Sequence, residues 1–77
     1  MTKLPIVNAN RMGKLLESAG FAFTHQKGSH KYYRHTDGRW TCVPYHKGKD
    51  LPRPLIRTIL QEIDMSVADY VTRLLET

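Results

Sequence analysis

The stretch FAFTHQKGSHKYYRHTDGRWTCV, residues 21–43, contains three short runs with the composition of β-strands, separated by two turn sequences. The first run alternates large and small side chains with period two, and the other two are rich in aromatic and β-branched residues. Lys27-Gly28-Ser29 is a short turn, and Asp37-Gly38 is typical of a tight β-hairpin. The sequence therefore predicts a three-stranded antiparallel sheet with strands at 21–26, 30–35 and 40–43.

An amphipathic helix is predicted immediately before this sheet. Its apolar side chains recur with the spacing i, i+3, i+4 and i+7, which forms one stripe along a helix: Met12, Leu15, Leu16 and Ala19. Asn8 is a good helix cap, and Gly20 is suited to the left-handed conformation that ends a helix. We place this helix at about 9–19.

Two further helices are predicted after the sheet and a basic loop at 45–52. Pro52 and Pro54 frame the start of the first, because proline is tolerated in the first turn of a helix. Its apolar stripe runs from Leu55 to Ile63. Ser66 then caps the last helix, with Asp69 three residues further on.

The predicted order is helix, three strands, helix, helix within a single domain over residues 1–77. An antiparallel sheet of this size needs one face covered, and helices on one side would leave the other face in water. We therefore predict an α+β two-layer sandwich, similar in shape to double-stranded-RNA-binding domains.

The composition favours an acidic partner in the cytoplasm. The formal charge is +5 and the sequence pI is near 9.7, which is typical of proteins that bind nucleic acid. A single cysteine, Cys42, excludes an intrachain disulfide and fits a reducing compartment. The N-terminal stretch has no long apolar run, so we expect no signal peptide and no membrane association.

The segment from Gln26 to His35 contains most of the reactive side chains. It carries two lysines, an arginine, two histidines and two tyrosines without an acidic residue. Cations attract phosphate, aromatic rings stack on bases, and histidine exchanges protons near neutral pH. His30 at the start of a strand is therefore a candidate general acid or base acting on RNA. A single histidine at a turn is, however, most often an ordinary surface residue.

Several motifs, taken in order, resemble the HicA toxin family of HicA–HicB toxin–antitoxin systems. The resemblance covers about residues 15–60 and rests on Ala19-Gly20-Phe21, Gln26-Lys27-Gly28-Ser29-His30, Asp37-Gly38-Arg39, Val43-Pro44-Tyr45-His46-Lys47-Gly48-Lys49 and Ile59-Leu60. It implies a fold similar to double-stranded-RNA-binding domains and a ribonuclease activity that cuts mRNA and arrests translation. It also implies that His30 is the catalytic residue. The implied partner is a HicB-type antitoxin, which masks the site and through which alone the complex would contact DNA.

Other residues are candidates for supporting roles. His46 would be a second proton-transfer group or a phosphate contact, although an ordinary loop histidine is an equal alternative. Lys27, Gly28 and Ser29 would contact the scissile phosphate, or merely form the turn. As a set, the remaining cations favour an RNA-binding surface, although each alone is more simply a solvated side chain: Lys31, Arg34, Arg39, Lys47 and Lys49.

The remaining histidines and the aromatic residues are expected to be mainly structural. His25 shares its parity with Phe21 and Phe23, which predicts a partly buried position or a strand end. His35 has the opposite parity to His30 and should face the other side of the sheet. Of the four aromatic residues that are able to stack on bases, we expect at most one or two to contact RNA: Tyr32, Tyr33, Trp40 and Tyr45.

No metal or other cofactor is expected. The histidines and Cys42 lack zinc-ligand spacing, and the sequence has no acidic cluster for a two-magnesium nuclease. The coherent mechanism is metal-independent acid–base cleavage, through a 2′,3′-cyclic phosphate. The alternatives are a non-catalytic double-stranded-RNA-binding module and a domain that only docks an acidic protein. The helix opening at 51–54 has Arg53 as its single cation, which argues against the RNA-binding module.

Overall fold

The computed structural model describes residues 4–76, in which three helices flank a three-stranded sheet as the sequence predicts. The elements are α1 (Ala9–Ser18), β1 (Ala22–Lys27), β2 (His30–Arg34), β3 (Trp40–Pro44), α2 (Arg53–Glu62) and α3 (Val67–Glu76). Each predicted strand and the first helix lie within one residue of their predicted bounds. Local signals set these limits. The side chain of Asn8 accepts the main-chain N–H of Arg11 at 2.8 Å, and the hydroxyl of Ser66 accepts that of Asp69 at 3.1 Å.

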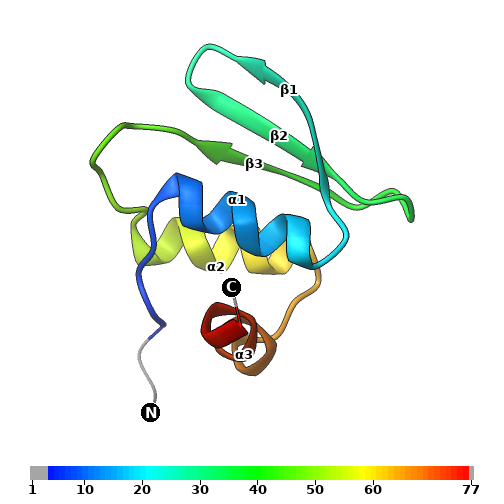
Figure 1. Cartoon of the computed structure of the whole chain (residues 1–77), viewed down its shortest axis with the longest axis vertical. Helices are drawn as coiled ribbons and strands as arrows, with labels where there is room; N and C mark the ends of the chain where they lie inside the picture. The colour runs from blue at the N-terminus through cyan, green and yellow to red at the C-terminus, as the bar shows by residue number, and fades with distance from the viewer. Residues whose placement is uncertain (1–3, 77) are drawn as a thin grey trace.

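The fold is the predicted α+β sandwich (Figure 1). The strands run antiparallel in the order β1-β2-β3, so β2 is bonded on both sides. Helices α1 and α2 lie against one face of the sheet, and α3 packs against α1 on the side away from the sheet. The other face of the sheet carries no helix. We call it the open face.

Strand register decides which side chains reach the open face. In β2, Tyr33 is buried toward the helices and pairs with Phe23 and Thr41. Side chains alternate between the two faces of a strand, so the residues next to Tyr33 in β2 point the other way. The open face therefore carries three rows across the sheet: Lys27-His30-Pro44, His25-Tyr32-Cys42 and Ala22-Arg34-Trp40.

The core lies between the helical face of the sheet and the helices. Its fully buried side chains come from every layer on that side, and they include Met12, Leu15, Val43, Ile56, Ile59 and Tyr70. Two arginine hydrogen bonds join the C-terminal part of α3 to the two ends of α1. Arg11 donates to the carbonyl of Leu74 at 2.8 Å, and Arg73 donates to that of Ser18 at 3.1 Å. The helical layers are thus held together by the core and by these two bonds, and they cover one face of the sheet while the other faces water.

Candidate active site on the open face

His30 is the first residue of the central strand, and its side chain is exposed on the open face. It pairs with Lys27 of β1 and with Pro44 of β3. The N–H of Tyr45 donates to the carbonyl of Ser29 at 2.6 Å, so the pair His30–Pro44 lies beside a hydrogen-bonded pair. His30 and Pro44 therefore form a non-hydrogen-bonded pair, in which side chains of neighbouring strands come closest together. The strand pairing fixes the backbone of His30, and its imidazole has the Lys27 side chain on one side and the Pro44 ring on the other.

The turn before His30 is a two-residue hairpin made by Gly28 and Ser29. Gly28 has a φ of 60°, and Ser29 is not among the residues with positive φ. A left-handed first residue followed by an ordinary second one is the pattern of a type II′ turn, which matches the twist of a hairpin. The side-chain amide of Gln26 donates to the carbonyl of Gly28 at 2.9 Å. The predicted Gly-Ser turn is confirmed, and it places Lys27 directly across from His30.

The loop that carries His46 starts beside this turn. The bond from Tyr45 to the Ser29 carbonyl holds the beginning of the loop, and the N–H of Lys49 donates to the carbonyl of His46 at 3.0 Å to close it. The side chains of His46, Lys47 and Lys49 are exposed. Two main-chain hydrogen bonds thus bring a histidine and two lysines to the same end of the sheet as His30.

The predicted cations do not all share one face. Lys27 and Arg34 lie on the open face with His30. Lys31 lies on the helical face, where its ammonium group sits 4.5 Å from the centre of the Tyr45 ring. This cation–π contact supports the start of the His46 loop. Lys31 thus acts on that loop from the opposite side of the strand to His30.

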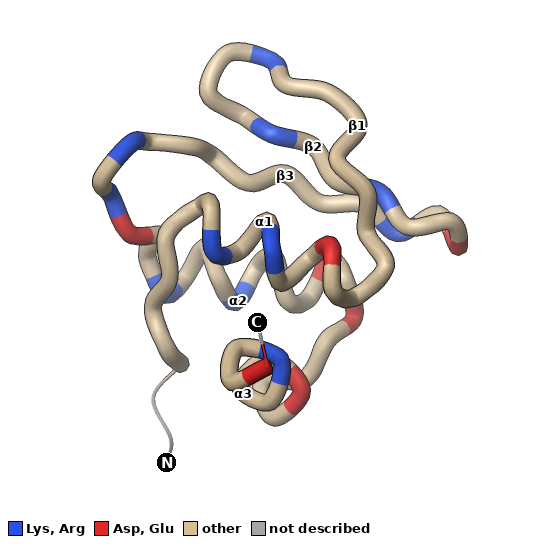
Figure 2. Tube along the Cα trace, in the orientation of Figure 1, with Lys and Arg blue, Asp and Glu red and all other residues tan. Residues whose placement is uncertain are grey.

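Acidic residues are absent from the three strands. All seven of them lie in helices, turns or loops. Figure 2 shows most of them on the helical layers, and it shows basic residues on the β1–β2 hairpin and on the loop after β3, where Asp50 also lies. The chain therefore presents a sheet without negative side chains, with more cations than carboxylates at the end that carries His30. A polyanion is the ligand that such a face attracts.

The prediction that His25 is partly buried or lies at a strand end is wrong. A bulge at Thr24 interrupts the register of β1, since Phe23 pairs with Tyr33 whereas His25 pairs with Tyr32. A single extra residue moves the following side chains to the other face of the sheet. His25 is therefore exposed on the open face, although it shares its sequence parity with Phe23. Its ring stacks on Tyr32 with centroids 4.4 Å apart and planes 4° from parallel.

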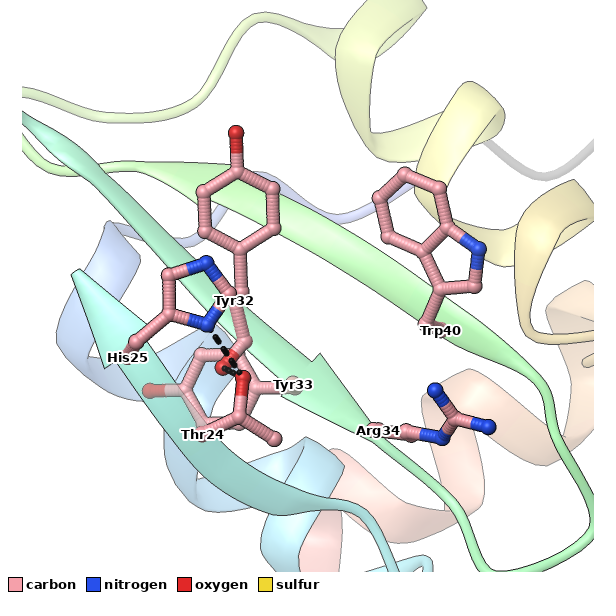
Figure 3. Close-up of a pocket in the computed structure, with 6 residues that line it drawn as sticks. All are labelled: Thr24, His25, Tyr32, Tyr33, Arg34 and Trp40. Carbon is pink, nitrogen blue, oxygen red and sulfur yellow. Dashed lines mark hydrogen bonds between the residues drawn. The ribbon is translucent and has the colours of Figure 1, made fainter. Parts of the chain in front are cut away.

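A shallow hollow of about 270 Å³ lies on the open face beyond this stack. Figure 3 shows the stacked His25 and Tyr32, with Thr24 beside them, on one side and Trp40 and Arg34 on the other. The sequence indicates Tyr32 and Trp40 only as possible stacking residues and does not predict a pocket. The spacing of Tyr32 and Arg34, two residues apart in a strand, does indicate that they share one face of the sheet. His25 lies on that face only because of the bulge in β1.

His35 has the structural role that its parity predicts. It packs edge-on against Phe21, with ring centroids 5.1 Å apart, and lies over Gly20. The N–H of Asp37 donates to its Nδ1 at 3.1 Å. Arg39 completes the turn by donating to the Asp37 carboxylate, whose pKa is held below its usual value mainly by the main-chain N–H of Arg39. The Asp-Gly-Arg motif is thus a turn and packing element.

Two observations concern the kinds of catalysis that the open face can support. Burial raises the pKa of the Cys42 thiol, so this open-face cysteine is not an activated nucleophile. Within residues 4–76, no three His, Cys, Asp or Glu side chains lie close enough together to hold a metal ion. In the same part of the chain, no helix has the length and apolar character needed to cross a bilayer.

Comparison with known protein families gives one match. Residues 9–65 match the family model described as "HicA toxin of bacterial toxin-antitoxin". The chain belongs to the HicA toxin family. The matched region runs from α1 through the whole sheet to the end of α2, and so it contains His30, the Gly-Ser turn and the His46 loop. This HicA protein is accordingly a toxin of a toxin–antitoxin system and has an antitoxin partner. A comparison with curated proteins found no match.

Proposed function

We propose that this HicA protein is an endoribonuclease that cleaves mRNA in the cytoplasm and thereby arrests translation. The observation that carries the proposal is the position of His30. Its imidazole is exposed on a sheet face without carboxylates, directly across the hairpin from Lys27. A cation beside a histidine can hold a phosphate while the histidine moves a proton.

In the proposed mechanism, His30 acts as a general base. Its neutral ring takes the proton from a 2′-hydroxyl, and the 2′-oxygen attacks the adjacent phosphorus. The bond from phosphorus to the 5′-oxygen breaks, which leaves a 2′,3′-cyclic phosphate on one fragment. Lys27 stabilises the additional negative charge on the phosphate in the transition state. The Gly28–Ser29 turn brings main-chain groups and the Ser29 hydroxyl to the same phosphate.

The departing 5′-oxygen needs a proton, which becomes its new hydroxyl hydrogen. We propose that His46 supplies it, because two hydrogen bonds anchor its loop beside the turn that precedes His30. Lys47 and Lys49, exposed in the same loop, would hold the neighbouring phosphates. Lys31 would act indirectly, since its ammonium group supports Tyr45 at the base of this loop.

The antitoxin partner is proposed to be of the HicB type and to cover the open face. A protein that neutralises the toxin by masking must exclude RNA from His30, so it has to present acidic groups to Lys27 and the basic loop. DNA would then be contacted only through the antitoxin.

The test is cleavage of a single-stranded mRNA by the purified toxin in excess EDTA, beside a folded His30→Ala variant. We expect the native protein to cut and the variant to lose about 10²–10⁴-fold in rate, the usual contribution of a positioned acid or base. Added imidazole should restore part of the lost rate. The fragments should end in a 2′,3′-cyclic phosphate and a 5′-hydroxyl.

Matched charge variants separate the site from the overall basicity. Lys27→Ala and Lys14→Ala remove the same charge, but Lys14 lies on the exposed side of α1. Cleavage should fall strongly only in Lys27→Ala. Equal cutting by native protein and His30→Ala would refute the assignment of His30. RNA binding without any cutting would instead identify a binding module.

A further inference from the structure

We infer that the hollow bounded by Tyr32, Trp40 and Arg34 is a binding subsite for one unpaired base of single-stranded RNA. This inference rests on the proposed function and names its substrate class more closely. The subsite would hold a base next to the phosphate that is cleaved at His30, so the enzyme would require RNA whose bases are accessible at the cut.

The shape of the hollow suits one flat heterocycle. Its volume of about 270 Å³ is just below the range of about 300–1,000 Å³ that sites for small molecules occupy. The Tyr32 and Trp40 rings lie side by side (Figure 3), with centroids 6.1 Å apart and planes tilted by 32°. Two facing rings would have to be about 7 Å apart to hold a base between them, so these two form a single aromatic surface beside the hollow. A base in the hollow can stack on this aromatic surface next to Arg34.

One face of the Tyr32 ring is already covered by His25. His25 stacks on it, and the His25 ring is held by a chain of two hydrogen bonds. The hydroxyl of Thr24 lies 2.9 Å from Nδ1 of His25 and 3.2 Å from the carbonyl oxygen of Tyr32, so it links the His25 ring to the main chain of β2. The stack holds the Tyr32 ring in place before a ligand arrives, which lowers the entropic cost of binding.

Exposure and charge identify the occupant. Trp40 is 55% exposed, which is high for the only tryptophan of a small protein. Arg34 reaches the rim of the hollow from the next row of the open face (Figure 3). Lys27 lies at the other end of the same face, and no strand residue carries a negative charge. Aromatic rings interleaved with cations are the pattern of single-strand binding surfaces.

The position of the hollow relative to His30 supports a neighbouring nucleotide. His30, Tyr32 and Arg34 alternate along β2 on the same face, so adjacent members are about 7 Å apart. RNA that crosses the sheet along β2 can place a phosphate at His30 and an adjacent base against Tyr32. Double-stranded RNA buries its base faces and is recognised mainly by shape, and therefore it offers no free base to stack on this aromatic surface.

Trp40 itself reports on the subsite, because it is the single tryptophan of the sequence and all tryptophan fluorescence comes from it. The native toxin is titrated with 2′-O-methyl RNA, in which the attacking hydroxyl is blocked. The comparison ligand is an abasic oligomer with the same number of phosphates. We expect the RNA to quench Trp40 at saturation, and the abasic oligomer to bind at low salt without quenching.

Two variants with similarly exposed aromatic residues complete the test. Trp40→Ala should weaken binding of 2′-O-methyl RNA by roughly 5- to 150-fold, as expected for loss of one stacked base. Phe23→Ala removes a ring that is 48% exposed on the same sheet but on its other face, and it should leave affinity unchanged. Single-stranded substrate should be cut much faster than the same sequence held in a duplex.

The outcomes distinguish this inference from the proposed function. If RNA is cut in a His30-dependent way but Trp40 is not quenched and Trp40→Ala binds normally, the subsite is refuted and the ribonuclease stands. If the fluorescence of Trp40 instead changes only when the toxin self-associates or binds an acidic protein, the subsite is likewise refuted. If RNA is neither bound nor cut, the proposed function fails and the subsite fails with it.

Discussion

Replacing Gly13 by alanine should destabilise the protein, although alanine is the better helix former. Gly13 lies in the middle of α1, and a Cβ built on it would be 2.4 Å from Oη and 3.3 Å from Cζ of Tyr33. The first distance is too short for non-bonded atoms, so α1 or the ring has to move. Tyr33 is only 7% exposed and belongs to the central strand, which leaves little room for that movement.

The magnitude follows from two opposing terms. Glycine to alanine within a helix gains about 0.8–1.0 kcal/mol, whereas overpacking a buried contact costs about 1–3 kcal/mol. The expected net loss is therefore about 0–2 kcal/mol in the free energy of unfolding. Tyr33→Phe removes the clashing oxygen and leaves the 3.3 Å approach to Cζ. In that background Gly13→Ala should be neutral or stabilising by up to about 1 kcal/mol.

The assay is a double-mutant cycle by urea denaturation at pH 7, followed by far-UV circular dichroism. All proteins carry His30→Ala, an exposed site, to limit toxicity during expression. The coupling between Gly13→Ala and Tyr33→Phe should be about 1–3 kcal/mol, whereas Lys14→Ala, an exposed neighbour on α1, should be additive with Tyr33→Phe. An additive cycle in which Gly13→Ala stabilises both backgrounds would refute the close packing of α1 on β2.

Three further predictions concern stability. Tyr70→Phe should cost about 1–3 kcal/mol, since the buried hydroxyl donates to the carbonyl of Pro5 at 2.7 Å. Burial raises the pKa of Tyr70, so its contribution should be complete below about pH 10 and lost as pH rises through the folded value, and Tyr70→Phe should flatten this alkaline limb in thermal melts. Arg39→Lys should lower stability by about 1–3 kcal/mol in urea, because lysine cannot keep both the bond to the Ile63 carbonyl and that to the Asp37 carboxylate. The pKa of Asp37 is lowered in the folded protein, so its ionised carboxylate stabilises the fold above about pH 4, and this stabilisation is lost as pH falls through the folded pKa. Asp37→Asn should therefore reduce the dependence of the melting temperature on acid pH. An unchanged dependence in this variant would exclude the role of Asp37.

The elements that the sequence predicted are those with local signals. The hairpin at Asp37-Gly38, the turn at Gly28 and the cap at Asn8 each depend on residues within a few positions of one another. These signals placed all three strands within one residue of their observed bounds. The same local logic gave the position of His30, because the turn before it fixes where the central strand begins.

The arrangement of the open face was not predictable in the same way. The extra residue at Thr24 has no signature in composition, and the stretch still alternates large and small side chains across it. The face of His25 therefore depends on pairing with a strand that is distant in sequence. The aromatic surface formed by Tyr32 and Trp40 likewise depends on the register between β2 and β3, which the core on the other face sets.

The two faces of the sheet divide stability from chemistry. The apolar side chains that β2 and β3 bury, Tyr33 and Val43, point toward the helices, whereas His30, Arg34 and Trp40 are exposed. A side chain exposed in the folded chain loses little contact when truncated, so substitutions on the open face should cost little folding free energy. Its backbone is nevertheless rigid, since β2 is bonded on both sides. A small chain can therefore hold a histidine and aromatic side chains in fixed relation without an enclosed pocket, and under the proposed function an antitoxin that covers this one face would mask both.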